Sequence, residues 1–262
     1  MEKSNELVAC SVYVDAADQN AGLNGYLVRP ARPGVYPGVI VCMEIFGVTG
    51  HMREVAGRIA EQGYIVMVPN YYWRHCPEAD FPHDAQGREE GMAFMRQLQR
   101  EQVLQDAASA RSYLLRREDC NGKVGIVGFS IGGHIAYLAA TQLNFEVAVS
   151  FYGGWIVRGG IRLSTPEPTA LLTAGMARSG TRFLGFVGGR DHLIGADEWE
   201  ELEQILTDHG VHHELVVYPE AKHGFFCDSR PDSYDPEAAR DAWTRLVGLL
   251  DEGLTRGISR SS

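Results

Sequence analysis

The chain has 262 residues, of which 45% are hydrophobic and 22% are charged, and its formal net charge is −10. This length and composition allow a full hydrophobic core, and the lack of a linker, a low-complexity tract or a fixed repeat predicts a single α/β domain over residues 1–262. Because acidic residues predominate and no cluster of lysine and arginine occurs, we do not expect nucleic acid as a partner.

The start of the chain, residues 1–7, lacks the basic and apolar regions of a signal peptide, and no uncharged apolar run reaches about 18 residues. The sequence therefore predicts a cytoplasmic protein without a membrane partner, either a monomer or a homodimer. Its five cysteines are scattered and form no C-x-x-C pair, so we expect neither a disulfide framework nor a metal site. Residues 256–262 are expected to fray.

Strand-like and helix-like patterns alternate along the first part of the chain. In chain order, the expected elements are strands over 8–14 and 25–28, a buried strand over 39–43, a helix whose apolar face carries Met52, Val55, Ile59 and Ala60, and a strand over 64–68. The first two strands are expected to form an antiparallel edge, because they alternate in polarity, whereas the later strands are uniformly apolar.

Residues 70–116 follow a different pattern. The first part contains aromatic residues, histidine and proline without a sustained period, which is normal for a loop that lines a pocket. Helical patterns follow over 91–98 and 103–115. We therefore expect residues 70–116 to contribute a loop and helices that partly line an active-site pocket.

The alternation continues through the second half of the chain. Strand-like runs cover 124–127, 147–151, 183–187 and 214–218, and a helix-like run covers 134–140. Strands separated by helices imply an α/β fold with a mostly parallel central sheet of about eight strands and helices on both faces. In such a fold the functional loops gather at the carboxyl ends of the strands.

The most informative motif is G-x-S-x-G at residues 128–132, between a strand-like run and a helix-like run. This is the context that a nucleophile elbow requires. A sharp turn between strand and helix strains the serine backbone, and glycines on either side remove side chains that would clash. The motif predicts Ser130 as a nucleophile.

A serine hydroxyl needs a base to remove its proton and an acid to orient that base. The chain order to expect is serine, then the acid, then histidine. Asp191 and His223 each follow one of the last two predicted strands, on the same rim of the sheet as Ser130. We predict these three residues as a catalytic triad, with Asp197 as the second choice for the acid.

Other histidines compete with His223 for the role of base. His134 lies one helical turn after Ser130, where packing explains it. His192 adjoins Asp191 and is expected to point away from the site when Asp191 points inward.

Acyl transfer also needs hydrogen-bond donors directed at the oxyanion. The expected donors are the backbone N–H group after the nucleophile and one from the loop after the third strand. In this chain they belong to Ile131 and Ile45.

Together these residues resemble the dienelactone hydrolase family of α/β-hydrolases. The matching segments are 37–41, 44–47, 60–64, 69–72, 128–133, 151–153, 189–191 and 223–225. The resemblance implies an α/β-hydrolase fold and the hydrolysis of esters and lactones of small substrates without a cofactor.

Founding members of the family use a cysteine nucleophile coupled to a glutamate that Glu44 matches, whereas this chain has Ser130. The resemblance leaves three auxiliary roles for Glu44: bonding Ser130 in the resting state, positioning water, or holding its loop. Because an ionised carboxylate near the oxyanion would oppose charge development, we expect Glu44 to be turned away or to have a raised pKa.

Members that cleave dienelactone grip a carboxylate with two arginines, and one of these positions is Cys227 here. Arg88 is the nearest match to the other, with Arg74 as an alternative. Since half of this pair is missing, we expect a larger or less charged ester, lactone or thioester. Aromatic walls for such a substrate are expected from Tyr72, Trp73, Tyr152 and Trp155, although core and rim packing is the alternative explanation.

The sequence thus favours a serine-dependent carboxylic ester hydrolase that forms an acyl-enzyme on Ser130. One alternative is a lactonising or Dieckmann-type cyclase, in which an internal nucleophile replaces water. Another is a non-catalytic ligand-binding protein with the same fold.

Overall fold

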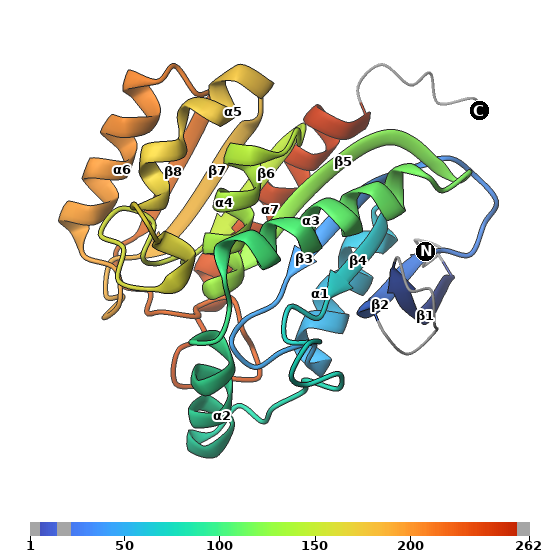
Figure 1. Cartoon of the computed structure of the whole chain (residues 1–262), viewed down its shortest axis with the longest axis horizontal. Coiled ribbons are helices and arrows are strands. Elements are labelled where there is room, and N and C mark those ends of the chain that lie inside the picture. Colours follow the sequence, from blue (N-terminus) through green and yellow to red (C-terminus); the bar gives the residue numbers. More distant parts are fainter. Residues whose placement is uncertain (1–5, 15–21, 256–262) are drawn as a thin grey trace.

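The computed structural model describes residues 6–14 and 22–255, so the expected fraying of 256–262 lies outside the described residues. Eight strands in this part of the chain form one sheet in the order β1-β2-β4-β3-β5-β6-β7-β8 (Figure 1). They are β1 (Leu7–Val14), β2 (Leu23–Pro30), β3 (Tyr36–Cys42), β4 (Ile65–Pro69), β5 (Cys120–Phe129), β6 (Val147–Phe151), β7 (Arg182–Gly188) and β8 (His213–Tyr218). β2 pairs antiparallel with β1 and β4, and all other neighbours are parallel.

Seven α-helices join or follow the strands in the described residues. They are α1 (Gly50–Glu61), α2 (Ala85–Met95), α3 (Arg100–Leu115), α4 (Ile131–Gln142), α5 (Ala174–Ser179), α6 (Ala196–Asp208) and α7 (Pro236–Leu250). None of these described helices combines the length and the apolar character needed to cross a membrane.

The helices cover both faces of the sheet. Crossovers between parallel strands are right-handed. Across the sheet, α1 connects β3 to β4 in one direction, whereas α3 and α4 lead to β5 and β6 in the opposite direction. α1 therefore lies on the opposite face from α3 and α4. α7 joins α1 on its face, where the Arg58 guanidinium lies 4.1 Å from the centre of the Trp243 ring.

The predicted fold class is confirmed, but several element boundaries differ from those expected, and two of the differences have a clear cause. β5 begins at Cys120 because its first residues extend beside β3, where Cys120 pairs with Tyr36. α2 begins at Ala85 because the Asp84 side chain caps it, accepting a 2.9 Å hydrogen bond from the Gly87 N–H.

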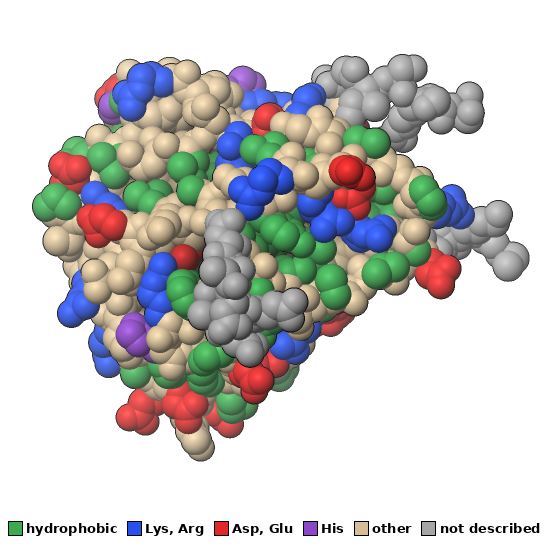
Figure 2. All heavy atoms as spheres, turned by 45° about the vertical axis from the view of Figure 1, so that its right-hand side comes forward, with side chains coloured by type: hydrophobic (Ala, Val, Ile, Leu, Met, Phe, Trp, Pro, Cys, Tyr) green, Lys and Arg blue, Asp and Glu red, His purple; other side chains and the backbone are tan. Residues whose placement is uncertain are grey.

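Charged side chains of both signs are interspersed on the face of the molecule in Figure 2. Blue and red side chains lie there among green apolar ones. A mixed surface of this kind differs from the basic stripe with which proteins hold a phosphate backbone.

The turn between β5 and α4 depends on glycines that allow a close approach of the backbone. A Cβ atom on Gly128 would lie 1.8 Å from the carbonyl oxygen of Gly132, and one on Gly132 would lie 2.2 Å from that of Cys42. No real side chain occupies such a position. The glycines therefore let α4 start directly after Ser130 and pack against the end of β3.

We expect Gly128→Ala to lower the free energy of unfolding by at least about 3 kcal/mol, because the new methyl group displaces backbone atoms. Urea unfolding measures the change. Gly248→Ala is the matched control, since Gly248 is exposed in α7 and a Cβ atom there meets nothing within 4 Å. Alanine at that position is expected to stabilise the helix by up to about 1 kcal/mol. Similar effects of the two variants would contradict this account of the turn.

Candidate active site

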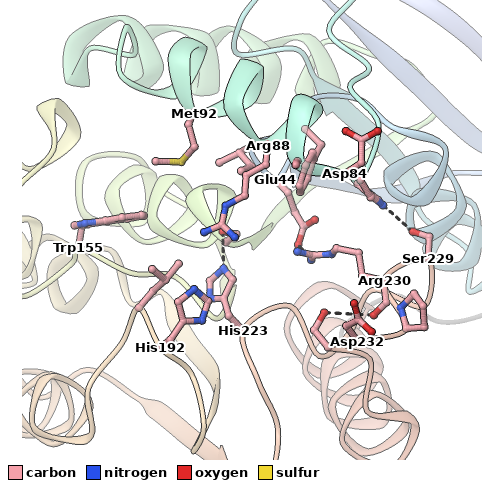
Figure 3. Close-up of a pocket in the computed structure, with 18 residues that line it drawn as sticks. Glu44, Asp84, Arg88, Met92, Trp155, His192, His223, Ser229, Arg230 and Asp232 are labelled. Carbon is pink, nitrogen blue, oxygen red and sulfur yellow. Dashed lines mark hydrogen bonds and ion pairs between the residues drawn. The ribbon is translucent and has the colours of Figure 1, made fainter.

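Loops after five neighbouring strands gather at the carboxyl edge of the sheet. The loops after β3, β5, β6, β7 and β8 carry Glu44, Ser130, Tyr152, Asp191 and His223, respectively. A cavity of about 480 Å³ opens among them and has Ser130 and His223 in its wall (Figure 3). Residues of the 70–116 segment, among them some of α2, form another part of the wall.

Ser130 is held in a backbone conformation that non-glycine residues rarely adopt. Its φ is 55° and its ψ is −118°. The Ser130 N–H donates a 2.9 Å hydrogen bond to the carbonyl oxygen of Phe151 in β6, and the Ser130 carbonyl oxygen accepts one from the Gly133 N–H. These bonds hold the turn in place and direct the hydroxyl into the cavity.

A chain of hydrogen bonds joins the three residues predicted as a triad. Ser130 Oγ lies 2.9 Å from His223 Nε2, and His223 Nδ1 lies 2.8 Å from Asp191 Oδ2. The Asp191 side chain is fully buried, and its Oδ1 accepts a 2.8 Å hydrogen bond from the Leu193 N–H. Asp191 therefore favours the tautomer of His223 with the proton on Nδ1, which leaves Nε2 able to accept the serine proton.

The competing acid and one competing base lie away from this chain. Asp197 is exposed and pairs with Arg158. His134 is buried and hydrogen-bonded to the Gly154 carbonyl oxygen and to Thr169 Oγ1. Burial lowers the pKa of His134 to about 4, so it stays neutral and serves packing.

His192 does line the cavity, and its ring centre lies 6.0 Å from that of His223. The expectation that it would point away from the site is therefore wrong. The hydrogen bond from the Leu193 N–H to Asp191 closes a turn, and this turn brings His192 back to the rim of the cavity.

The two N–H groups predicted as oxyanion donors lie in adjoining segments. Ile131 is the first residue of α4, where a helical N–H has no acceptor four residues earlier. Ile45 lines the cavity. Its N–H group takes part in none of the backbone hydrogen bonds that join the loops and turns of the described residues. The close contact of Gly132 with the end of β3 brings these two segments together.

Glu44 is 2% exposed and ion-paired, with its Oε1 accepting a 2.7 Å hydrogen bond from Arg230 Nη2 (Figure 3). Burial alone would raise the pKa of Glu44, but Arg230 and, after it, His51, His223 and His83 lower it. Of the two alternatives expected for Glu44, the raised pKa is therefore wrong, because an arginine that the sequence did not indicate faces this carboxylate. Glu44 is ionised and directed at Arg230.

Two of the predicted substrate-binding residues line the cavity. Arg88, from α2, and Trp155 both extend into it in Figure 3. Arg74, the alternative to Arg88, is instead held by the buried carboxylate of Asp106 through hydrogen bonds of 2.6 and 2.9 Å.

The other three predicted aromatic residues do not line the cavity, because internal contacts hold them elsewhere. The Tyr72 hydroxyl donates to the Ile45 carbonyl oxygen at 3.2 Å, and the Trp73 indole N–H donates to Asp106 at 3.3 Å. Tyr152 is fully buried, and its ring packs against the rings of His223 and Phe225. For these three residues, packing is the correct explanation.

Arg230 is the cavity residue that sequence reasoning missed. The pattern of the family predicts a second arginine at Cys227, but Cys227 is buried and is not in the cavity wall. Arg230, a little further along the same loop after His223, lines the cavity together with Arg88. The interpretation that half of the arginine pair is missing considered position 227 alone, and Arg230 brings a second guanidinium to the cavity wall from another position in the loop.

The strand order, the strained serine at the β5–α4 turn and the hydrogen-bond chain define an α/β-hydrolase. The model of the dienelactone hydrolase family matches residues 23–254, and the chain belongs to this family.

Individual relatives agree with this assignment. A "Putative carboxymethylenebutenolidase" of Synechocystis sp. is 36% identical over 242 residues, which are 92% of this chain and 96% of the relative. A "Carboxymethylenebutenolidase" of Pseudomonas sp. is 29% identical over 228 residues, which are 86% of this chain and 88% of the relative. The crystal structure of a "Putative Dienelactone Hydrolase" from Klebsiella pneumoniae is 29% identical, with a TM-score of 0.81 over 95% of this chain and 100% of that one.

We expect Arg230→Met to lower the free energy of unfolding by about 3 to 5 kcal/mol near pH 7, because Glu44 becomes an uncompensated buried carboxylate. In wild type Arg230 is the strongest of the groups that lower the pKa of Glu44 against burial, so this pKa rises when Arg230 is removed. The variant therefore shows its full loss of unfolding free energy at pH values above the pKa that Glu44 has in the variant. The loss becomes smaller at lower pH, where Glu44 takes up a proton.

Urea unfolding at about pH 7 and about pH 5 measures this deficit and its pH dependence. Arg190→Met is the matched control, because Arg190 pairs with Glu220 on the exposed surface, and its effect is expected to stay below about 0.5 kcal/mol. A deficit of Arg230→Met that is equal at both pH values would contradict the ionised state of Glu44.

Proposed function

We propose that this protein is a serine hydrolase that cleaves a carboxylic ester, lactone or thioester through an acyl-enzyme on Ser130. The observation that carries the proposal is the unbroken hydrogen-bond chain from Ser130 through His223 to Asp191 in the cavity wall. Membership of the dienelactone hydrolase family supports the same chemistry.

In the acylation step, Ser130 Oγ attacks the carbonyl carbon of the substrate while its proton moves to His223 Nε2. Asp191 stabilises the imidazolium that forms. The proton then passes from Nε2 to the leaving atom as its bond to the carbonyl carbon breaks. When the substrate is a lactone, the leaving oxygen remains attached to the acyl group.

In the deacylation step, a water molecule adds to the acyl carbon while His223 Nε2 takes its proton. Ser130 Oγ then leaves the tetrahedral intermediate and regains that proton. The N–H groups of Ile45 and Ile131 are the proposed oxyanion donors in both steps, and each contributes about 3 kcal/mol to the transition state. Glu44, which Arg230 keeps ionised, is assigned the role of holding the loop that carries Ile45.

The cavity supports a substrate that carries a carboxylate. Arg88 extends into it and Arg230 lines it, and guanidinium groups bind carboxylates with paired, charge-assisted hydrogen bonds. Trp155 and Met92 supply apolar wall. The name of the Pseudomonas relative specifies a carboxymethylenebutenolide, which is a lactone with a carboxyl group. We propose a small anionic lactone or ester as the substrate class.

We expect Ser130→Ala to lower kcat for p-nitrophenyl acetate by about 10⁴-fold or more, because no other group can form the acyl-enzyme. Ser233→Ala is the matched control, since Ser233 lines the same cavity and its hydroxyl donates to the carbonyl oxygen of Arg230, away from the proposed triad. The release of p-nitrophenol measures both rates. Wild-type rates in Ser130→Ala would refute the proposed nucleophile.

We expect Arg88→Met to raise KM for a carboxylate-bearing ester or lactone by about 30-fold, which corresponds to roughly 2 kcal/mol of charge-assisted bonding. The KM for the neutral p-nitrophenyl acetate is expected to change little. Arg96→Met, at the far end of α2, controls for changes in the helix. An equal rise in KM for the charged and the neutral substrate would show that Arg88 does not bind a carboxylate.

A further inference from the structure

A second cluster of reactive side chains adjoins the cavity and takes no step in the proposed mechanism. Ligand-type atoms of Glu44, His83 and Cys227, one from each residue, lie within 4.8 Å of one another. Glu44 comes from the loop after β3, His83 from the segment before α2, and Cys227 from the loop after β8. Glu44 and His83 line the cavity, whereas Cys227 is buried beneath its wall.

The spacing of these atoms suits a tetrahedral metal ion. Cys227 Sγ lies 3.9 Å from His83 Nδ1. Zinc binds sulfur at about 2.3 Å and nitrogen at about 2.0 Å, so neighbouring sulfur and nitrogen ligands stand about 3.5 Å apart in a tetrahedron. Zinc binding therefore needs a shift of a few tenths of an ångström at this edge. It also replaces the contacts of both atoms with Ser229 Oγ, which lies 2.9 Å from His83 Nδ1 and 3.2 Å from Cys227 Sγ. Thiolate, imidazole and carboxylate are also the ligands that zinc takes in proteins.

A buried oxygen of Glu44 lacks a partner. Glu44 Oε1 binds Arg230, but within the described part of the chain Glu44 Oε2 makes no hydrogen bond of normal geometry. Glu44 is 2% exposed, so water does not readily reach this oxygen. Buried polar atoms are rarely left in this state, and a cation would satisfy it.

The neighbours of Cys227 are polar. Cys227 Sγ lies 3.2 Å from Ser229 Oγ, and beside it His51 Nδ1 lies 3.3 Å from Asp228 Oδ1. Zinc binds cysteine as the thiolate, so the thiol gives up its proton when the metal binds.

We propose that Cys227, His83 and Glu44 bind a zinc ion in the wall of the catalytic cavity, with a water molecule as the fourth ligand. The thiol proton leaves to solvent when zinc binds. Glu44 Oε1 keeps its bond to Arg230 while Oε2 takes the metal. The charges of the thiolate, Glu44 and Asp228 offset the zinc ion beside this arginine.

Zinc at this site inhibits hydrolysis, a consequence that rests on the proposed function. Glu44 and His223 line the same cavity. A divalent cation on Glu44 disfavours the His223 imidazolium that forms at each proton transfer. The site thereby links hydrolysis to the concentration of free zinc.

The binding test uses Co²⁺ as a spectroscopic substitute for zinc on the full-length protein. We expect a thiolate-to-cobalt charge-transfer band in the near ultraviolet that saturates at one metal ion per chain and disappears when Zn²⁺ is added. We expect Cys227→Ser to lose the band and to weaken zinc binding, measured by competition with a chelator, by about 100-fold or more. Cys76→Ser is the matched control, because Cys76 is a partly buried cysteine outside the cluster, and it keeps the band.

His83→Gln provides a second variant, and near-ultraviolet circular dichroism shows that each variant is folded. We expect folded His83→Gln to bind zinc as weakly as Cys227→Ser. A folded Cys227→Ser or His83→Gln that binds zinc as tightly as wild type would overturn the proposal, as would a wild-type protein without a thiolate–cobalt band.

The binding site and the proposed hydrolase can fail separately. We expect the inactive Ser130→Ala variant to keep the cobalt band, because the band does not depend on turnover. In active protein, we expect micromolar zinc to lower the rate of ester hydrolysis, a chelator to restore it, and Cys227→Ser to show at least about tenfold less inhibition at the same zinc concentration. Inhibition that is unchanged in Cys227→Ser would overturn the assignment of the inhibitory site.

Discussion

Ser130 holds a positive φ that costs about 1 to 3 kcal/mol, and the rest of the site depends on that conformation. The cost is met by α4, which is buried along nearly its whole length and packs directly beneath the turn. Gly128 and Gly132 allow this packing because neither position has room for a Cβ atom. The hydroxyl consequently meets His223 on a rigid scaffold, although the two residues lie 93 positions apart in the chain.

Two buried carboxylates lie near the catalytic histidine and have different partners. Asp191 is bonded to His223 itself and to a backbone N–H group, so its charge acts on the imidazole. Glu44 is bonded to Arg230, so its charge is largely compensated within the cavity wall. This division allows a carboxylate to lie near the reacting serine without opposing the oxyanion, and it leaves one Glu44 oxygen available for the zinc ion we propose.

The parts of this protein that local sequence patterns control could be predicted, including the parallel strands, the elbow at Ser130 and the loops that carry Asp191 and His223. Parallel topology places the ends of such strands at one edge, which is why distant residues could be grouped correctly. The contacts of Arg230 and Cys227 could not be predicted, because they depend on how a long loop folds back over the cavity. Trp73 shows the same limit, since its indole is held by Asp106 from a separate helix.

The central claim is that Ser130 is the residue that becomes covalently modified. Peptide mapping by mass spectrometry, after reaction of the wild-type protein with a fluorophosphonate, tests it most directly. The account predicts a single adduct on the peptide that contains Ser130, formed only while His223 is intact. An adduct on the Cys227 peptide instead, or no adduct on a folded protein that still hydrolyses esters, would contradict it.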